Sequence, residues 1–291
     1  MAEVRSNKNN KKTAILLATY NGSRYLKEQI DSLLAQTFHD WVLYVHDDGS
    51  TDNTLEILYQ YAAKHDNIII LEYDSKHGAK DNFFSLMEHV ESDYYFFCDQ
   101  DDVWHPEKMQ FFLQKMQKTE ADHTELSVIV YSDATVVDEE LHTISPSFFS
   151  QAGIYPEFIT NFNECGATAF IPGCAMAFNQ AAKKSMVRPY HQAQMHDEWL
   201  TLSVFKARGI VTRIDGCYVC YRQHQDNAVG AADKNMLNIT YRLTHLRSIL
   251  QSNILHYQTL RAIGYGSLLK YLHYKIRYKV NIIKKRRKDK I

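Results

Sequence analysis

Short apolar runs alternate with amphipathic segments through the first half of the chain. Apolar runs typical of buried strands cover residues 14–19, 41–46, 68–72 and 94–98. Apolar residues recur at helical spacing between and after these runs, which predicts helices over residues 23–36, 52–64, 81–90 and 106–118. Strands separated by such helices indicate an α/β fold with a mostly parallel sheet and helices on both faces. Ligands bind such sheets at the carboxyl ends of the strands, so the residues after each strand are the candidates for chemistry.

The second half of the chain is less regular. Strand-like runs cover residues 127–131, 174–178, 210–214 and 218–221, and residues 196–207 have a helical pattern. From Asp233 onward the pattern is helical, rich in Tyr, His and Arg, and without strand signals. We therefore predict a main domain over residues 1–230 and a helical extension over residues 231–291.

Charge divides the chain into an acidic body and a basic tail. The 291 residues are 45% hydrophobic and 23% charged, as in ordinary globular proteins, and the net charge of -1 argues against a nucleic-acid partner. Residues 270–291 hold ten basic residues and one acidic residue, a net charge of +9, so the other 269 residues sum to -10. This asymmetry predicts a cation site in the body and an anionic surface as a partner of the tail.

The basic tail has two interpretations. Residues 265–283 place apolar side chains among basic ones, as in a helix that lies on an anionic membrane leaflet. The alternative is a helix that covers the main domain and ends in a solvated charged segment. The Tyr-rich segment 241–274 is in addition a candidate face for a homodimer.

Several features predict a cytoplasmic protein, held peripherally on the inner face of the cell membrane if the tail binds lipid. The first residues are polar and lack the apolar run of a signal peptide, and no stretch approaches the length of a spanning helix. Five cysteines, an odd number, are typical of reduced thiols. Cys217 and Cys220 form a C-x-x-C pair without two further zinc ligands at useful spacing, so we expect a structural role.

The segment DQDD at residues 99–102 is the most informative one. It follows the apolar run YYFFC and precedes a predicted helix that begins near Pro106. The carboxylates of Asp99, Asp101 and Asp102 repel one another unless a cation or hydrogen bonds compensate. Mg²⁺ or Mn²⁺ is the natural compensation, because either ion combines one or two carboxylates with phosphate oxygens. The alternative is a turn in which one aspartate caps the helix.

Two further segments follow predicted strands. Asp48 lies in DDGSTD at residues 47–52, which is ordinary turn and helix-cap chemistry but also places carboxylates where a nucleobase could bind. Lys80 lies at the start of a predicted helix, where it could face a diphosphate. The glycine-rich fingerprints of dinucleotide and P-loop sites are absent from the sequence.

Candidate residues also lie in the second half of the chain. Asp197 and Glu198 open a predicted helix, where a carboxylate either stabilises the helix or acts as a general base on an attacking hydroxyl. Arg222 could hold a phosphate, and His224 could complete a metal shell, or both could belong to a solvated loop.

Four segments of the chain resemble the nucleotide-binding and D-x-D motifs of family-2 glycosyltransferases of the GT-A fold. In chain order they are residues 18–22 (ATYNG), 36–38 (QTF), 47–52 and 99–102. The resemblance runs from Thr13 to Gly230. His196 stands where the family usually has Glu or Asp before the catalytic Asp, which leaves the base between Asp197 and Glu198, with Asp197 preferred. The common Q-x-x-R-W motif is absent, and RQH-x-x-N from Arg222 resembles a variant of bacterial polysaccharide transferases, many of them rhamnosyltransferase-like.

The resemblance implies an inverting, metal-dependent transfer from a nucleoside-diphosphate sugar, such as a UDP- or dTDP-sugar, to a glycan or lipid-linked glycan acceptor. Asp197 would be the base, and Mn²⁺ or Mg²⁺ the cofactor. The implied metal ligands are Asp101, Asp102 and His224, and the implied contacts of the nucleotide sugar are Thr19, Tyr20, Asn21, Asp48, Lys80, Asp99, Gln100 and Arg222. The alternatives are a nucleotidyltransferase that makes the sugar nucleotide and a non-catalytic binding module.

Overall fold

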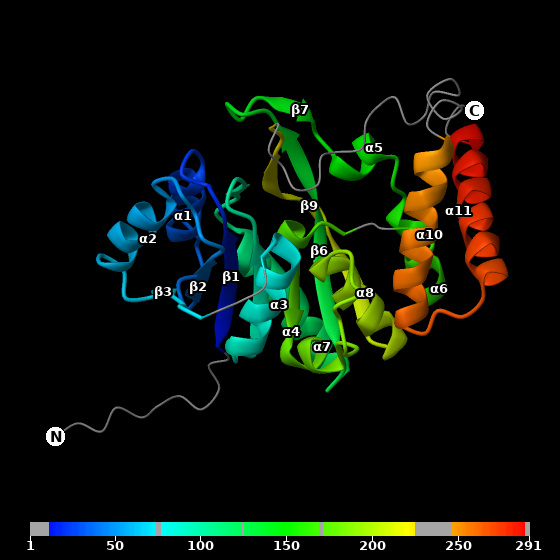
Figure 1. Ribbon diagram of the computed structural model, residues 1–291, viewed down its shortest axis with the longest axis horizontal. Helices are drawn as coiled ribbons and strands as arrows, with labels where there is room; N and C mark the ends of the chain where they lie inside the picture. The colour runs from blue at the N-terminus through cyan, green and yellow to red at the C-terminus, as the bar shows by residue number, and fades with distance from the viewer. Residues whose placement is uncertain (1–11, 74–76, 124, 169–170, 225–245, 289–291) are drawn as a thin grey trace.

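The computed structural model describes residues 12–73, 77–123, 125–168, 171–224 and 246–288. Within these residues one nine-stranded sheet has the order β3-β2-β1-β4-β8-β6-β9-β5, and β7 pairs with β6 (Figure 1). The strands are β1 Thr13–Thr19, β2 Val42–Asp47, β3 Ile68–Ile70, β4 Tyr94–Cys98, β5 Val103–Trp104, β6 Val128–Val137, β7 Thr143–Ser145, β8 Met176–Asn179 and β9 Ile210–Arg222.

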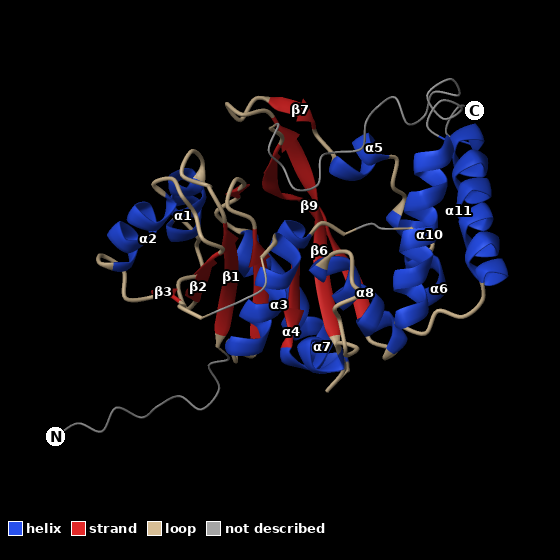
Figure 2. Ribbon diagram, in the orientation of Figure 1, coloured by secondary structure: helices blue, strands red, loops and turns tan. Residues whose placement is uncertain are grey.

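Helices pack around this sheet (Figure 2). The α-helices are α1 Leu26–Leu34, α2 Thr54–Ala62, α3 Ala79–His89, α4 Lys108–Asp122, α5 Phe148–Ala152, α6 Phe162–Gly166, α7 Gln180–Ser185, α8 His196–Lys206, α10 Leu246–Ala262 and α11 Leu268–Lys288. Two 3₁₀ turns are η1 Pro156–Phe158 and η2 Gly173–Ala175. The predicted boundary near residue 230 lies outside the described residues.

The sheet is parallel over β3, β2, β1 and β4, as the alternating pattern predicted. Beyond β4 it is mixed, because β8 runs antiparallel to both β4 and β6, whereas β9 is parallel to β6. The parallel register pairs Thr19 with Asp47 and Leu17 with Cys98, so the chain leaves β1, β2 and β4 at one edge of the sheet. This edge carries the acidic segment.

Alternate residues of the buried strands feed two separate cores. On β4, Tyr95 and Phe97 belong to the core that α3, α8 and the C-terminal helices cover. Tyr94 and Phe96 belong to the core that α1, α2 and α4 cover. Every residue of β4 is buried, as expected for a strand with helices on both faces.

Four predicted elements need correction. The two strands expected at residues 210–214 and 218–221 are one strand, β9, which passes through Gly216 at a φ of +103° and accommodates the interruption by a shifted register against β6. The strand expected from Cys174 begins at Met176, because η2 precedes it. Helix α4 begins at Lys108 rather than at Pro106, whose carbonyl accepts a hydrogen bond from the Thr37 amide at 2.9 Å.

The C-terminal helices α10 and α11 form an antiparallel pair beside α6 and α8 (Figure 1). Leu260, Ile263, Tyr265 and Tyr271 extend one core of the main domain into this pair. No helix among the described residues combines the length and apolar character that a bilayer span requires.

Candidate active site

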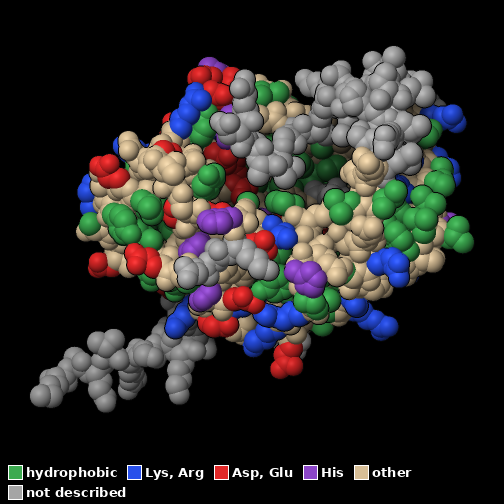
Figure 3. Space-filling view, viewed as in Figure 1, with side chains coloured by type: hydrophobic (Ala, Val, Ile, Leu, Met, Phe, Trp, Pro, Cys, Tyr) green, Lys and Arg blue, Asp and Glu red, His purple; other side chains and the backbone are tan. Residues whose placement is uncertain are grey.

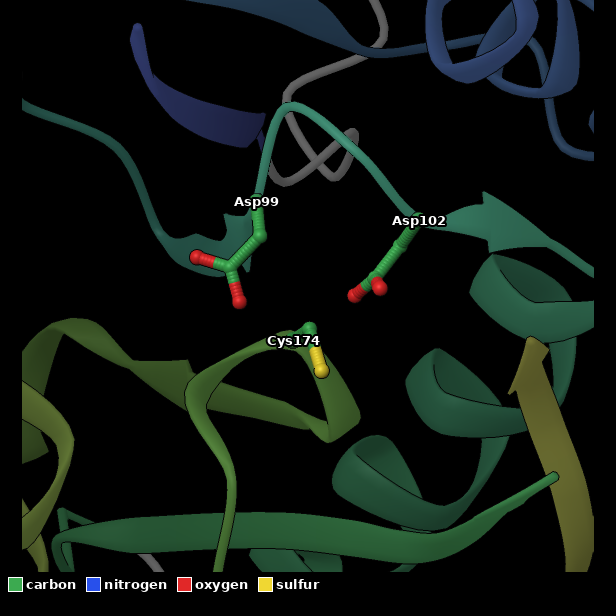
Figure 4. A group of neighbouring side chains, drawn as sticks. All are labelled: Asp99, Asp102 and Cys174. Atoms are coloured by element: carbon green, nitrogen blue, oxygen red, sulfur yellow. The ribbon is translucent and has the colours of Figure 1, made fainter. Parts of the chain in front are cut away.

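The side chains of Asp99, Asp102 and Cys174 converge where β4 ends (Figure 4). Asp99 follows β4, Asp102 precedes β5, and Cys174 lies in η2. One ligand atom of each residue lies within 4.8 Å of the other two. The turn between β4 and β5 therefore brings the first and last aspartates of DQDD together.

The cluster of Asp99, Asp102 and Cys174, the acidic corner, holds carboxyl groups whose charged forms are unfavourable. Asp102 is fully buried; its Oδ1 accepts a hydrogen bond from the Arg222 amide at 3.0 Å, and its Oδ2 has no hydrogen-bond partner among the described residues. Burial, followed by the charge of Asp101, raises the pKa of Asp102 to about 7. Burial and the charge of Asp102 also raise the pKa of Asp99 well above its ordinary value. A bound cation would relieve both effects.

The donor atoms of the corner fit a hard divalent cation. Carboxylate oxygens are the ligands that Mg²⁺ and Mn²⁺ prefer. Burial raises the pKa of the Cys174 thiol well above its ordinary value, which keeps the thiol protonated and a poor ligand. Asp99 and Asp102 are therefore the residues of the corner suited to hold the ion.

Lys108 lies beneath the corner and was missed by the sequence analysis. Its buried Nζ donates to the Cys174 carbonyl at 2.6 Å and lies 3.2 Å from the centre of the Trp104 ring. Burial lowers the pKa of Lys108 to about 7. The sequence could have indicated its burial, because Lys108 lies on the same buried face of α4 as Met109 and Phe112.

Asp101 and His224 form the partly exposed rim of the site. His224 Nε2 lies 2.7 Å from Asp101 Oδ2. The structure thus places both residues beside the corner, although the cluster that the ligand atoms define consists of Asp99, Asp102 and Cys174. Their predicted role as metal ligands stays a prediction.

Arg222 ends β9 and holds the acidic turn from behind. It is 1% exposed, and its Nε donates to the Asp101 carbonyl at 2.7 Å. Its other guanidinium nitrogens bind the Glu139 carbonyl and the Glu28 carboxylate. These donors face protein atoms, so the geometry shows an anchor of the turn, and the predicted phosphate contact stays a prediction.

Gln100 connects the acidic turn to the loop after β1. Its Oε1 accepts from the Tyr20 amide at 2.9 Å, and its Nε2 donates to the Tyr20 carbonyl at 3.0 Å. A Cβ at Gly22 would lie 2.2 Å from Gln100 Oε1, so the loop approaches this amide closely. The Tyr20 ring is left 55% exposed beside the site, available for stacking.

The loops after β1 and β2 are also bonded to each other. Thr19 Oγ1 donates to Asp47 at 2.7 Å, and Asn21 Oδ1 accepts from the Thr51 amide at 2.8 Å. Asp48 points away from these bonds toward the segment after β3, where it accepts from the Gly78 amide at 2.7 Å. These bonds hold Thr19 and Asn21 against the loop after β2, whereas the Asp48 side chain faces the segment after β3.

Lys80 lies further along the same edge, in the first turn of α3. Its Nζ is 3.5 Å from the His191 carbonyl and 3.6 Å from Asp81. Among the residues that the structure describes, no hydrogen bond or ion pair joins Lys80 to the acidic corner, so its role at a diphosphate stays a prediction.

Asp197 reaches the site from α8 across η2. Its Oδ2 accepts from the Gly173 amide at 2.9 Å, next to Cys174 of the acidic corner, and its Oδ1 accepts from the Glu198 amide at 2.7 Å. Burial raises the pKa of Asp197 to about 6, and its charge contributes to the raised pKa of Asp99. A carboxylate with this pKa can accept a proton near neutral pH.

Glu198 faces the C-terminal helices instead. Its Oε1 lies 3.4 Å from His256 Nδ1 of α10, and burial raises its pKa to about 7. Because the two side chains diverge, only Asp197 is directed toward the acidic corner, which favours the preferred assignment of the base.

His196 supports the first turn of α8 from within the core. Its ring stacks on Phe83 at 4.0 Å and meets Phe97 edge-on. Burial lowers its pKa to about 3, so the ring is neutral. His196 therefore packs as a neutral ring in the core.

The space-filling view shows acidic side chains in a hollow between the two halves of the molecule (Figure 3). The sequence analysis missed Cys174, Lys108 and Gly173, because their contribution depends on η2 and α4 meeting the acidic turn.

Comparison with known proteins identifies the family of the chain. Residues 14–186, more than half of the chain, match the model of glycosyl transferase family 2. A dTDP-rhamnosyl transferase, RfbG of Shigella flexneri, is 30% identical over 254 residues, which cover 81% of this chain and 79% of the relative. The chain therefore belongs to glycosyl transferase family 2.

Solved structures show the same fold. TarS 1-349 of S. aureus, in complex with UDP, has a TM-score of 0.57 at 15% identity over 96% of this chain and 92% of that chain. The mannosyltransferase PcManGT of Pyrobaculum calidifontis, in complex with GDP-Man and Mn²⁺, has a TM-score of 0.53 at 16% identity over 94% of this chain and 70% of that chain. The chain thus has a GT-A-like α/β fold with added C-terminal helices, as the sequence predicted, and its activity is that of a glycosyltransferase.

Proposed function

We propose that the enzyme transfers a sugar, with inversion, from a nucleoside-diphosphate sugar to a hydroxyl group of a growing, lipid-linked surface glycan. A UDP- or dTDP-sugar is the donor, and dTDP-rhamnose is the first candidate because the relative RfbG is a dTDP-rhamnosyl transferase. The structural neighbours that hold UDP and UDP-GlcNAc support a donor of this class.

The observation that carries the proposal is the position of η2 between two sets of carboxylates. Asp99 and Asp102 meet Cys174 on one side of this turn, and Asp197 binds the Gly173 amide on the other. A transferase that inverts needs charge compensation at the leaving group and a base on the opposite face of the sugar. The position of η2 next to both supports the proposal that these two functions share one site.

Asp99 and Asp102 would hold the divalent cation, Mn²⁺ or Mg²⁺, with Asp101 and His224 at the rim. When bound, this ion neutralises the charge that develops on the departing diphosphate. Tyr20 stacks near the base, Asp48 contacts the base edge, and Thr19, Asn21, Lys80 and Gln100 line the donor between them. Arg222 contributes by anchoring the acidic turn from behind.

Asp197 takes the proton of the acceptor hydroxyl. The hydroxyl oxygen forms a bond to the anomeric carbon while the bond from that carbon to the diphosphate oxygen breaks, and its electron pair leaves with the nucleoside diphosphate. One displacement of this kind inverts the anomeric configuration. The unionised fraction of Asp197 is inactive, because only the carboxylate can accept the proton.

The test is a donor screen with purified protein, Mn²⁺ and a panel of sugar nucleotides that includes dTDP-rhamnose. We expect release of a nucleoside diphosphate that rises with acceptor, and a product of inverted anomeric configuration by NMR. Asp197→Asn should lower kcat about 10²- to 10⁴-fold while donor affinity is kept. Glu198→Gln is the matched control and should retain most of the activity.

The same screen separates the alternatives. Formation of a sugar nucleotide from a nucleoside triphosphate and a sugar 1-phosphate would identify a nucleotidyltransferase and contradict the proposal. Binding of sugar nucleotides without any turnover would identify a binding module. Full activity of the Asp197→Asn variant would place the base elsewhere.

A further inference from the structure

The outer face of α11 is an apolar stripe within a basic helix. Six large apolar side chains of α11 are 41–79% exposed, namely Leu268, Leu269, Leu272, Ile276, Val280 and Ile283. With about 100° of rotation per residue, all six fall within an arc of about 120°. Figure 3 shows hydrophobic and basic side chains together over this end of the molecule.

The opposite face of α11 is already occupied by the main domain. Tyr271 is buried, and the Tyr278 hydroxyl accepts from the Tyr155 amide at 2.8 Å. Arg277 pairs with Glu164 at 2.9 Å, and Lys285 pairs with Glu157. The inner face therefore explains how the helix is attached, and it leaves the stripe unexplained.

The charges beside the stripe are uniformly positive. Residues 265–288 contain no Asp or Glu. Lys279, Lys284 and Arg287 are exposed and form no ion pair with any residue that the structure describes. Such a face fits an anionic partner that also accepts apolar side chains.

We propose that the outer face of α11 binds the surface of an anionic lipid bilayer, with the helix axis in the membrane plane. Exposed apolar residues enter the boundary of the acyl chains while lysine and arginine side chains reach the lipid phosphates. A second copy of the same face is a poor partner, because a twofold contact would set like charges against each other.

This docking would hold the candidate active site close to the membrane. His256 of α10 contacts Glu198 next to Asp197, so the C-terminal pair is joined to the helix that carries the proposed base. The proposal stands apart from the glycosyl-transfer chemistry, since it rests only on the charge and exposure of α11.

The test is flotation of the full chain with vesicles of phosphatidylcholine, alone or mixed with phosphatidylglycerol. Wild-type protein should float only with the anionic vesicles, and added salt should weaken the binding. The triple variant Lys279→Gln/Lys284→Gln/Arg287→Gln should bind about 100-fold more weakly, at about fivefold per basic residue. The triple variant Leu269→Gln/Ile276→Gln/Ile283→Gln should lose binding more than tenfold.

The controls are Ile144→Gln on β7 and Lys118→Gln on α4, which remove an exposed apolar and an exposed basic residue outside α11. Both should float like wild type, and circular dichroism should show that every variant is folded. Absence of flotation with anionic vesicles would overturn the proposal, as would equal binding by the α11 variants and the controls. A dimer that only the apolar variant loses, without vesicle binding, would assign the stripe to a second copy instead.

Discussion

At the residue scale, the environment decides which aspartates remain charged. Burial raises the pKa of Asp52, but hydrogen bonds from Thr54 and Ser23 outweigh it and bring the pKa to about 2. Asp102 accepts one backbone hydrogen bond, from Arg222, and its pKa is about 7. Hydrogen bonds therefore keep Asp52 charged next to the start of α2, whereas Asp102 is poised for a cation.

The pH dependence of transfer tests the proposed base. Because Asp197 must be ionised to accept a proton and its pKa is about 6, kcat should rise with pH through this value and then level off. Glu198, with a pKa of about 7, is mostly uncharged where Asp197 titrates, so Glu198→Gln should leave the rising limb near its wild-type pH and keep the plateau within a few-fold of wild type. Initial rates between pH 4.5 and 8.5 measure both effects. Loss of the plateau in Glu198→Gln would make Glu198 the base.

Sequence reasoning reached the aspartates of this site because their positions after strands are local features. It could not reach Lys108 or Cys174. Both contribute through contacts between distant segments; the bond from the Lys108 Nζ to the Cys174 carbonyl joins residues 66 positions apart. The different directions of the Asp197 and Glu198 side chains were not predictable either, because Glu198 faces His256 of α10, which is distant in the sequence.

At the element scale, the end of β9 acts as a clamp on the turn between β4 and β5. Arg222 contributes its amide to Asp102 and its guanidinium to Asp101, to Glu139 and to Glu28 of α1. Its guanidinium carbon also lies 4.5 Å from the centre of the Tyr25 ring. A strand, a turn and a helix thus depend on one planar, multidentate group.

Replacing this group tests the clamp. Arg222→Lys keeps the charge but cannot bind three partners in one plane, so we expect a loss of about 2 kcal/mol in the free energy of unfolding and a weaker response to Mn²⁺. Urea denaturation with and without Mn²⁺ measures both. Arg213→Lys is the matched control in the same strand; its 3.8 Å pair with Asp133 is partly exposed, so we expect a change within about 0.5 kcal/mol. Equal effects of the two changes would refute the clamp.

Helices and strands with a regular pattern of apolar residues were predictable, whereas the pairing of strands in the sheet was not. The apolar patterns of residues 94–98 and 196–207 predict a strand and a helix from local sequence alone. In the structure, β4 and α8 occupy nearly those ranges. β5 and β7, of two and three residues, are too short to leave a pattern. The antiparallel position of β8 between β4 and β6 depends on contacts between distant segments, which periodicity cannot report.

At the scale of the whole molecule, the acidic corner costs stability that a cation can restore. Asp102 has a folded pKa of about 7 against an ordinary value of 3.8, so its protonated form stabilises the fold below pH 4 and this contribution is lost as pH rises to 7. Asp102→Asn should remove this loss of stability at neutral pH, and the amide oxygen of the new side chain can still accept the hydrogen bond from the Arg222 amide. The melting temperature of the variant should therefore exceed that of wild type by about 4 °C at pH 7, and by less at pH 4.

Mn²⁺ should make wild type more stable than Asp102→Asn, because an ion that binds the native state raises its stability. At pH 7.5 the ion should raise the melting temperature of wild type and leave that of Asp102→Asn unchanged. Asp138→Asn is the control, since Asp138, Glu140 and His142 form the other cluster of ligand atoms among the described residues and lie in an exposed turn. A Mn²⁺ response lost in Asp138→Asn but kept in Asp102→Asn would move the cation site from the carboxyl end of β4 to that turn, and the diphosphate with it.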